Sequence, residues 1–587
     1  MSVLQDPTAP RHVRRLEASL TPSRPEGHDG DTTVAERAAW TLVWLGVLTG
    51  GIDLWGFWWS SPLTVVLAGV ITLGGIVGMT ACWVVRSPRS TVLQALGLGA
   101  ALVAVAFPEG VIIHTRLFYT TDSAAFDDVA SRALLHGSNP YTTSLSGAAR
   151  LLEVPDRFWT YTIAGGHVTH ASYPAGSFLV NVPAMALGMH HHVVDWMDLT
   201  AWVVTGLLLF AFMPAALRWF AALVVLTPIF AGMFGNSGTD ATFLPFLVVA
   251  VWRWDRFALG PDAGRVRWLG PIALGVACAI KQLPWFCVPF LLLGVAIEAR
   301  RQGRSPFGTG VRYLVPVVVT FAVINLPFAL WSPGPWLHGT LTPFVDPLIA
   351  DGQGLVALAT HGVTGGADLA FLAAAGALAL VALLGAFATW YSALKRVWPL
   401  LLPAAFFFSA RSLSSYLVDL FPVAVVAAVT VADAPASSRP LGSATRHRRS
   451  DRGRGLIPWV AVGMPTAGVV VCSALAFSSA PLQLSVLSVQ SSHRGRVLDA
   501  VTVTVHNPTD AALSPHFLVN TGNQPNGFWK PSGGRGTVVR PHGTVTLTLR
   551  SPVQTTAPEP GARWLVEAYT STPRALSTSP MVVWSRS

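Results

Sequence analysis

Apolar runs long enough to cross a bilayer recur along most of this chain. The first three cover residues 38–59, 63–85 and 91–113. A run of about twenty apolar residues matches the hydrocarbon thickness of a membrane. Only 12% of the 587 residues are charged and 52% are hydrophobic, whereas soluble domains carry about 25% charged residues. The sequence therefore predicts a polytopic α-helical membrane protein with about eleven to thirteen transmembrane helices.

The basic residues stand mostly in short clusters between these runs. The formal net charge is +10, and a nucleic-acid-binding protein would concentrate such charge on one soluble face. Clusters beside apolar runs instead fit cytoplasmic anchors, because positively charged loops stay inside the cell. We therefore expect a lipid bilayer around the chain and no nucleic-acid partner. Residues 1–37, with Arg11, Arg14 and Arg15, are predicted to be a disordered cytoplasmic tail.

Two apolar runs have arginines at both ends. The run 268–297 is flanked in this way, so both of its ends are expected in the cytoplasm and the run must turn back. Non-helical backbone at membrane depth is tolerated only inside protein or beside a water-filled cavity. The turn is predicted at Lys281. The run 397–432 repeats the pattern and places Arg411 at its tip.

The topology between residues 173 and 253 has two solutions. A full span at 173–189 would place Arg253 and the arginines after it outside the cell, against the positive-inside rule. A half-span there, which Pro174 and Pro183 favour, restores the parity.

The chain changes character at about residue 480. Segments there alternate or are rich in β-branched residues, and Asn-Pro, Gly-Gly and Pro-His-Gly breakers separate them. This pattern predicts a small β-sandwich. The predicted domains are the tail 1–37, a transmembrane domain 38–479 with outer loops 114–172 and 332–366, and an extracytoplasmic β-sandwich 480–587.

The first outer loop holds the sharpest chemical candidate, Asp122. Apolar residues recur every three to four positions from there to His136, which predicts an amphipathic helix on the outer leaflet. A carboxylate at the membrane surface can act as general base toward a sugar hydroxyl. The alternative is that Asp122 is the N-cap of this helix and that Asp127 and Asp128 are solvated.

Basic side chains at the two predicted tips, Lys281 and Arg411, are the next candidates. Ionisable groups at membrane depth are functional candidates by default, and arginine binds phosphate bidentately. The alternative is that each tip is wet and its side chain reaches water. His361 could contact an anionic donor or be an ordinary loop residue. Asp240 could line the same cavity or cap the next helix.

Motifs for cofactors are missing from the sequence. It contains no P-loop, no GxGxxG and no zinc signature. The run His190–His192 lacks the spacing of a metal pair on one helix face. We therefore expect no nucleotide-driven pump, no cofactor and no metal site, while a divalent metal is left open.

The first outer loop carries a resemblance to a known family. The order Asp122, Phe126, Val129, Ala130, Leu134, Leu135, Gly137 and Asn139-Pro140-Tyr141 resembles the first outer loop of GT-C type membrane glycosyltransferases. It is similar to that of the polyprenol-phosphate-mannose-dependent mannosyltransferases of glycosyltransferase family 87. Tyr173-Pro174, Gly275–Pro284 and Ser409–Pro422 are similar to later segments of that family, so the resemblance covers about residues 90–430. The added β-domain looks more like that of envelope arabinofuranosyltransferases.

The resemblance implies a metal-optional inverting sugar transfer. Asp122 would deprotonate the acceptor hydroxyl, and the lipid phosphate leaving group would be held by Lys281, Arg411 and His361. The donor would be a polyprenyl-phosphate-linked mannose or arabinofuranose, and the acceptor an envelope glycan or glycolipid. Further cavity-lining candidates are Asp127, Asp128, Tyr141, Tyr173, Asp240 and Tyr416. A transporter or flippase of an envelope lipid and a non-catalytic membrane scaffold are the alternative functions.

Overall fold

Seven helices in the described part of the chain are long and apolar enough to cross a membrane. The computed structural model describes residues 34–57, 62–85, 90–227, 238–431, 459–478, 480–492, 496–521, 527–532 and 537–585. By length and composition the seven candidate spans are Thr64–Val84, Thr91–Thr115, Val193–Phe212, Leu283–Arg301, Pro306–Trp331, Leu369–Thr389 and Trp459–Ala476. Shorter apolar helical stretches are Gly176–Ala186, Ala215–Leu226, Trp398–Phe407 and Ser414–Thr430. The chain is therefore a multi-pass membrane protein, as its apolar runs predict.

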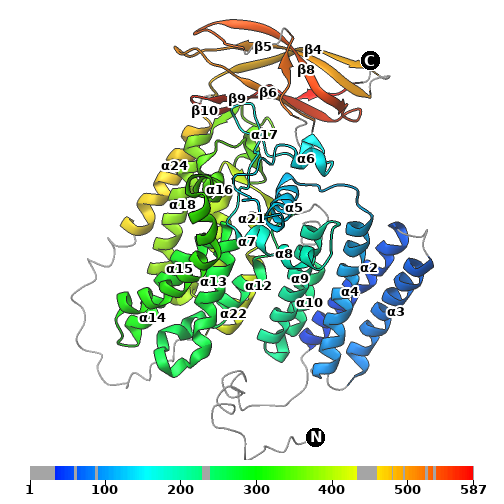
Figure 1. The fold of residues 1–587 in the computed structure, drawn as a ribbon, viewed down its shortest axis with the longest axis vertical. Helices are drawn as coiled ribbons and strands as arrows, with labels where there is room; N and C mark the ends of the chain where they lie inside the picture. The colour runs from blue at the N-terminus through cyan, green and yellow to red at the C-terminus, as the bar shows by residue number, and fades with distance from the viewer. Residues whose placement is uncertain are drawn as a thin grey trace, which may run out of the picture. The chain divides into compact units, whose positions relative to one another are not determined.

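The N-terminal helices belong to a compact unit of their own, made of Met1–Phe107 and Leu209–Thr227. Its elements are α2 (Val34–Phe57), α3 (Pro62–Val84), most of α4 (Thr91–Thr115), the end of α9 (Val193–Phe212), η2 (Ala215–Leu217) and α10 (Arg218–Leu226) (Figure 1). α2 packs along α3, and Arg37 Nη1 donates to the Cys82 carbonyl at 2.7 Å. Because α2 begins at Val34, the predicted tail 1–37 is too long, and residues 1–33 lie outside the described residues.

The second unit, Pro108–Leu208 and Pro228–Ser587, holds the remaining elements. Its first loop, residues 114–172, and the stretch after it contain α5 (Asp122–Leu135), α6 (Ala148–Leu151), η1 (Asp156–Phe158), α7 (Gly176–Leu179) and α8 (Val182–Ala186). The predicted helix exists, but eight residues of α5 are buried, acidic ones included. Because α5 packs against α6, α7 and α8, it is a core helix and not an amphipathic helix on a leaflet. α7 and α8 are far too short to span, which matches the half-span solution.

The apolar run that was predicted to turn back does so. After α12 (Leu244–Val251), η3 (Trp254–Ala263) and η4 (Arg265–Trp268), it consists of α13 (Leu269–Ile280), η5 (Leu283–Phe286) and α14 (Cys287–Arg301). Arg304, just after α14, lies 3.2 Å from the carboxylate of Asp262, just before α13. The two ends of the run therefore meet, and Lys281 in extended backbone (φ −146°, ψ 157°) ends α13 at the turn.

The second run with arginines at both ends folds back in the same way. It follows α18 (Leu369–Thr389) and α19 (Tyr391–Leu394), and its elements are η6 (Trp398–Leu401), α20 (Leu402–Phe407), β3 (Arg411–Ser412), α21 (Ser414–Val418) and α22 (Phe421–Thr430). Arg396 Nε donates to the carbonyl of Val431 at 3.2 Å, so both ends of the run lie together. Arg411 therefore stands at the tip, as predicted.

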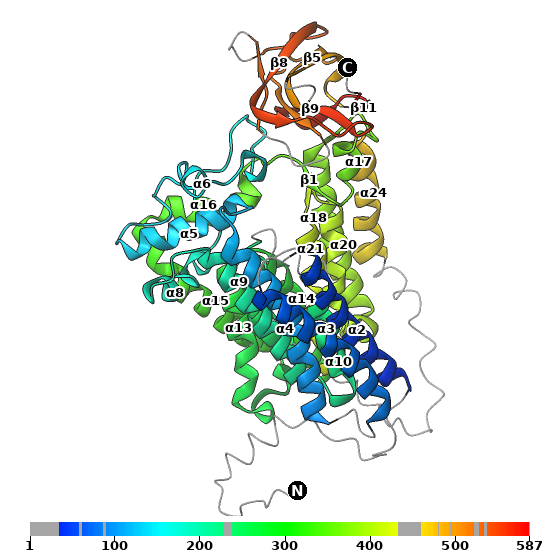
Figure 2. The same cartoon turned by 90° about the vertical axis from the view of Figure 1, so that its right-hand side faces the viewer.

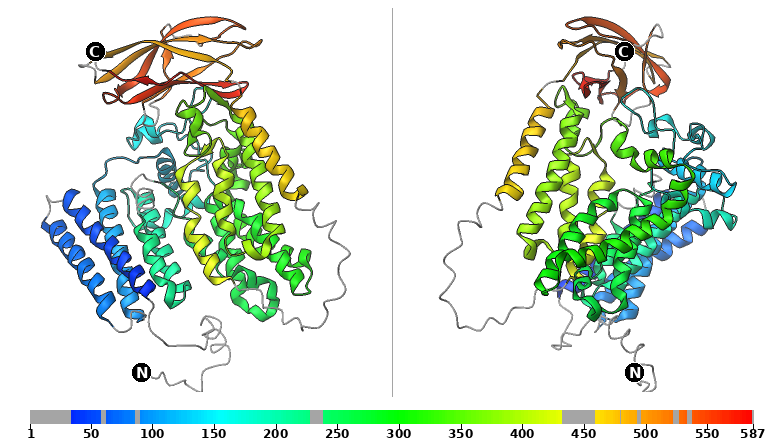
Figure 3. Two further views of the ribbon diagram at one scale, coloured as in Figure 1. Left: turned by 180° about the vertical axis from the view of Figure 1, so that it is seen from behind. Right: turned by 60° about the vertical axis from the view of Figure 1, so that its left-hand side comes forward.

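The second loop, residues 332–366, connects the membrane helices to the C-terminal region. α15 (Pro306–Trp331) is followed by α16 (Pro333–Val345), β1 (Asp351–Gly352), α17 (Ala357–Thr360) and β2 (Gly366–Asp368). β1 pairs in parallel with β3, with Asp351 opposite Arg411. η7 (Trp459–Gly463) and α24 (Met464–Ala476) then run alongside α18 (Figure 3).

Two antiparallel sheets form the C-terminal region, as predicted. The strands are β4 (Gln483–Ser492), β5 (Val497–His506), β6 (His516–Asn520), β7 (Lys530–Pro531), β8 (Thr544–Thr556), β9 (Arg563–Ser571), β10 (Arg574–Thr578) and β11 (Val582–Val583). One sheet has the order β4-β5-β8-β7, and the other contains β11-β9-β10 with β6 paired to β9 (Figure 2). Side chains from both sheets, such as Val503 and Val566, share one buried core. The two sheets therefore pack as a sandwich, as the alternation of the sequence predicts.

A strand from outside the predicted β-domain completes the second sheet. β2, just before α18, pairs antiparallel with β10 from Gly366 to Asp368. Beneath this junction, Ala367 and Leu372 share a buried cluster with Leu576. The sandwich is therefore joined to the transmembrane domain by backbone hydrogen bonds and a common apolar core.

Gly366→Ala should loosen this junction. Gly366 has φ +146°, and a Cβ there would overlap the Leu576 carbonyl oxygen and lie 2.8 Å from Ser577 Cα. Because both obstacles are backbone of β10, we expect a loss of about 1–3 kcal/mol. The unfolding midpoint of the detergent-solubilised protein and its resistance to protease should both fall. A Cβ at the neighbouring Gly365 meets nothing within 4 Å, so Gly365→Ala is the control, and an equal effect of both variants contradicts the prediction.

Candidate functional site

Tyr173 stands where the predicted site residues meet. It follows the first loop and precedes α7, and its carbonyl accepts a hydrogen bond from Tyr141 Oη at 2.8 Å. Lys281 Nζ lies 5.1 Å from the centroid of its ring. Burial raises the pKa of Tyr173; Tyr416, Asp127 and Asp122 raise it further, while Arg411 lowers it. Candidates from three segments, α5, the turn at Lys281 and the tip at Arg411, therefore lie within electrostatic reach of one phenol.

Asp122 is buried at the start of α5, but it does not cap that helix. The N-cap is Thr121, whose hydroxyl accepts the Ala124 N–H. The Asp122 carboxylate instead accepts the backbone N–H of Thr160 and, at 3.1 Å, the Thr160 hydroxyl. Burial raises the pKa of Asp122 above its ordinary value, against the lowering effect of these bonds and of Arg411. A carboxylate of raised pKa is a better proton acceptor than an ordinary one.

Asp127 and Asp128, candidates for cavity lining, are buried, which excludes the alternative that they are solvated. Asp127 Oδ1 accepts the Ser177 hydroxyl at 2.9 Å, and burial raises the pKa of Asp127 to about 7. Asp128 accepts the hydroxyl of Tyr119 at 2.9 Å and pairs with the guanidinium of Arg132. Among the described residues, no cation forms an ion pair with Asp127. Asp128, in contrast, is held by Tyr119 and Arg132.

Lys281 is surrounded by carboxylates. Its ammonium forms an ion pair with Asp240 and lies 3.3 Å from the Thr239 hydroxyl. Asp419 and Asp198 also attract its charge. A phosphate at this position would have to displace a carboxylate that is already bound. Lys281 is therefore better suited to hold the buried segments together than to bind an anion.

Arg411 is differently placed. Its nearest acidic partner is Asp351, with the closest nitrogen and oxygen 3.9 Å apart and the side chain 23% exposed. Its buried Nη1 has no hydrogen-bond partner among the described residues. A buried guanidinium N–H without an acceptor is costly, so this atom is available to an oxygen of a ligand.

The remaining predicted site residues are Tyr141, Tyr416 and His361. Tyr141 is buried against Phe178, and Tyr416 packs on Phe406 at the second tip. His361 is exposed at the end of α17, where its Nδ1 contacts the Ala357 carbonyl of its own turn.

The β-sandwich contributes groups that sequence reasoning missed. Glu567 on β9 is 3% exposed and accepts hydrogen bonds from Tyr569 and Asn520, each at 2.9 Å. Burial raises the pKa of Glu567 to about 7. Burial also raises the pKa of Tyr569, which Glu567 and Asp351 raise further and Arg411 lowers. The only sequence signal for these groups is an acidic residue, Glu567, within an apolar strand. Because Arg411 acts on Tyr569, this part of the sandwich lies near Arg411.

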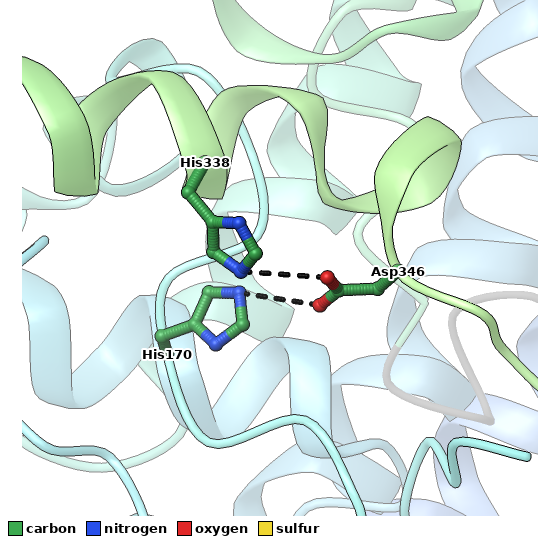
Figure 4. A group of neighbouring side chains, drawn as sticks. All are labelled: His170, His338 and Asp346. Atoms are coloured by element: carbon green, nitrogen blue, oxygen red, sulfur yellow. Dashed lines mark ion pairs between the residues drawn. The ribbon is translucent and has the colours of Figure 1, made fainter. Parts of the chain in front are cut away.

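A second cluster joins the two loops. His170, His338 and Asp346 place one donor atom each within 4.8 Å of the others, and Figure 4 shows the two imidazoles on the same side of the carboxylate. His170 comes from the first loop, whereas His338 lies on α16 and Asp346 ends it. No metal site was predicted, because residues so far apart in sequence form no spacing motif.

Comparisons of this chain with protein-family models, with curated proteins and with solved structures found no match.

Asp127→Asn should stabilise the protein increasingly as pH rises from about 4 to 7. The folded-state pKa of Asp127 is about 7 and its ordinary value is 3.8, so folding opposes ionisation. The wild type loses stability as pH rises through this window, and the loss is complete above the folded pKa. The neutral variant lacks this loss and keeps an acceptor for Ser177.

The measurement is the difference in unfolding midpoint between variant and wild type across that window. Asp128→Asn is the matched control, because it removes the partner of Arg132 and should lower the midpoint instead. A difference for Asp127→Asn that stays constant with pH contradicts the prediction.

Proposed function

We propose that this chain is a GT-C type membrane glycosyltransferase that transfers a sugar from a polyprenyl-phosphate donor to an acceptor hydroxyl, with Asp122 as general base. The supporting observation is the pair Asp122 and Arg411. A buried carboxylate lies within electrostatic reach of a guanidinium that has a buried N–H without an acceptor. This combines a base for the incoming hydroxyl with a cation for a departing phosphate.

The chemistry needs both groups at opposite ends of the reacting sugar. The acceptor oxygen attacks the anomeric carbon, its proton passes to Asp122, and the bond from that carbon to the phosphate oxygen breaks. The bonding electrons leave with the polyprenyl phosphate, whose new charge Arg411 stabilises. Preorganised charge stabilisation is usually the largest contribution to such a step, and proton removal by a placed base adds about 10²–10⁴-fold.

A lipid-linked donor suits the surroundings of the site. The seven candidate spans would hold the polyprenyl chain in the bilayer while the phosphate reaches the tip at Arg411. The two folded-back runs and the sandwich support a site on the extracytoplasmic face, with mannose or arabinofuranose as the sugar and an envelope glycan or glycolipid as acceptor.

Two residues take different parts from those that the family resemblance implies. The ammonium of Lys281 is neutralised by Asp240, so we assign it to positioning Tyr173 and the first loop. His361 contacts its own turn at the surface and is not assigned to the phosphate. Arg411 is assigned to the phosphate of the leaving group.

Asp122→Asn should lower sugar transfer by about 100-fold or more. Vesicles from cells that express the full chain would receive polyprenyl-phosphate mannose or arabinofuranose carrying a radiolabelled sugar, with a mannose- or arabinose-containing glycolipid as acceptor. The labelled glycolipid is the product measured. Arg411→Met should chiefly weaken the transfer of sugar from the polyprenyl-phosphate donor. Arg411→Lys should restore part of this transfer, because the positive charge returns.

Asp156→Asn, on the same loop, is the control for the loss of a carboxylate, and the amount of protein in the membrane is the control for folding. Full transfer by Asp122→Asn would refute the mechanism. Movement of the labelled donor across the vesicle without a new glycosidic bond would instead identify a flippase.

A further inference from the structure

The cluster of His170, His338 and Asp346 gathers one ligand atom from each residue within 4.8 Å of the others, and the two histidines approach different oxygens of the carboxylate. His338 Nε2 lies 3.4 Å from Asp346 Oδ1, and His170 Nε2 lies 3.6 Å from Asp346 Oδ2. Hydrogen bonds between nitrogen and oxygen span about 2.7–3.2 Å, so both separations are too long for a direct bond. Two ligands of a tetrahedral zinc ion, each about 2.05 Å from the metal, stand about 3.4 Å apart.

We propose that His170, His338 and Asp346 bind a zinc ion that clamps the first loop to α16. Two imidazoles and one carboxylate are a ligand set that zinc takes at three-ligand sites, with water in the fourth position. The imidazoles face each other with ring centroids 4.7 Å apart. His338 is the more exposed, at 51% of its side chain, so its ring has room to close the remaining gap to the ion.

The surroundings of the cluster fit a clamp. Gln282, next to Lys281, donates through Nε2 to the carbonyls of Ser172 at 3.0 Å and Thr340 at 2.9 Å. Each of these carbonyls lies two residues from one of the histidines. The amide of Gln282 and the ion therefore join the same two segments, and the ion fixes the stretch that leads to Tyr173.

Thr342 explains how the cluster is held when the metal is removed. Its hydroxyl donates to the His338 carbonyl at 3.0 Å, so it accepts from His170 Nε2 at 2.9 Å. Zinc would replace the proton on that nitrogen. A two-histidine, one-carboxylate set also suits octahedral iron(II), and the geometry of a cobalt-substituted site distinguishes the two.

The test uses the full chain in detergent, purified without a histidine tag and treated with chelator. Zinc titrated against a competing dye should bind at one equivalent per chain and raise the unfolding midpoint by several degrees. Cobalt(II) should give the strong visible absorption of a four-coordinate ion. His338→Ala and Asp346→Asn should each lose this equivalent and the rise in midpoint.

His191→Ala is the matched control, because His191 is exposed in a run of three histidines that could bind metal adventitiously; it should keep the zinc. The metal-free midpoints of all variants show whether they fold. The proposal is overturned if the wild type binds no zinc, if both ligand variants bind it unchanged, or if cobalt gives the weak spectrum of a six-coordinate ion. Loss of the zinc in His191→Ala alone also overturns it. None of these readouts depends on sugar transfer.

Discussion

The ammonium of Lys281, buried among carboxylates, is the interaction on which the interior of the second unit depends. An isolated charge in such a place costs several kcal/mol, so the chain must supply partners. Asp240 pairs with it directly, and Asp198 holds the backbone N–H groups of Ala241 and Thr242 at 2.7 and 2.9 Å. These contacts hold together the segment from Asp240 to Thr242, the ring of Tyr173 and the turn between α13 and α14.

The broad architecture could be predicted because it follows from where apolar and charged residues are stable in lipid and in water. Arginines at both ends of a run dictate that it turns back, and the contacts of Arg304 with Asp262 and of Arg396 with Val431 confirm both turns. The alternation after residue 480 likewise predicted the sandwich. The alternative that Asp122 caps α5 is excluded because Thr121 is the N-cap. Thr121 and Asp122 are both good caps, and only backbone geometry decides between such neighbours.

What escaped prediction depends on contacts between distant segments. Solvation was an alternative for Asp127 and Asp128 because acidic residues on a loop are usually exposed, yet α6, α7 and α8 cover the helix that carries them. The carboxylates around Lys281 could not be foreseen either, since they come from several elements. His170 and His338 meet only because the two loops fold against each other, and β2 is too short to give a periodic signal.

The apolar cluster at the base of the sandwich makes it inseparable from the rest of the protein. Tyr161 of the first loop, Leu372 of α18 and Tyr569 of β9 are buried in this one cluster. A chain cut at residue 480 would lose Leu518, Tyr569 and Leu576 from that cluster and expose the unpaired edge of β2, and exposed sheet edges invite aggregation. The sandwich is thus not an independent module fused to a finished membrane domain. Truncation would report misfolding, and its contribution can be separated only by point changes that leave the shared core filled.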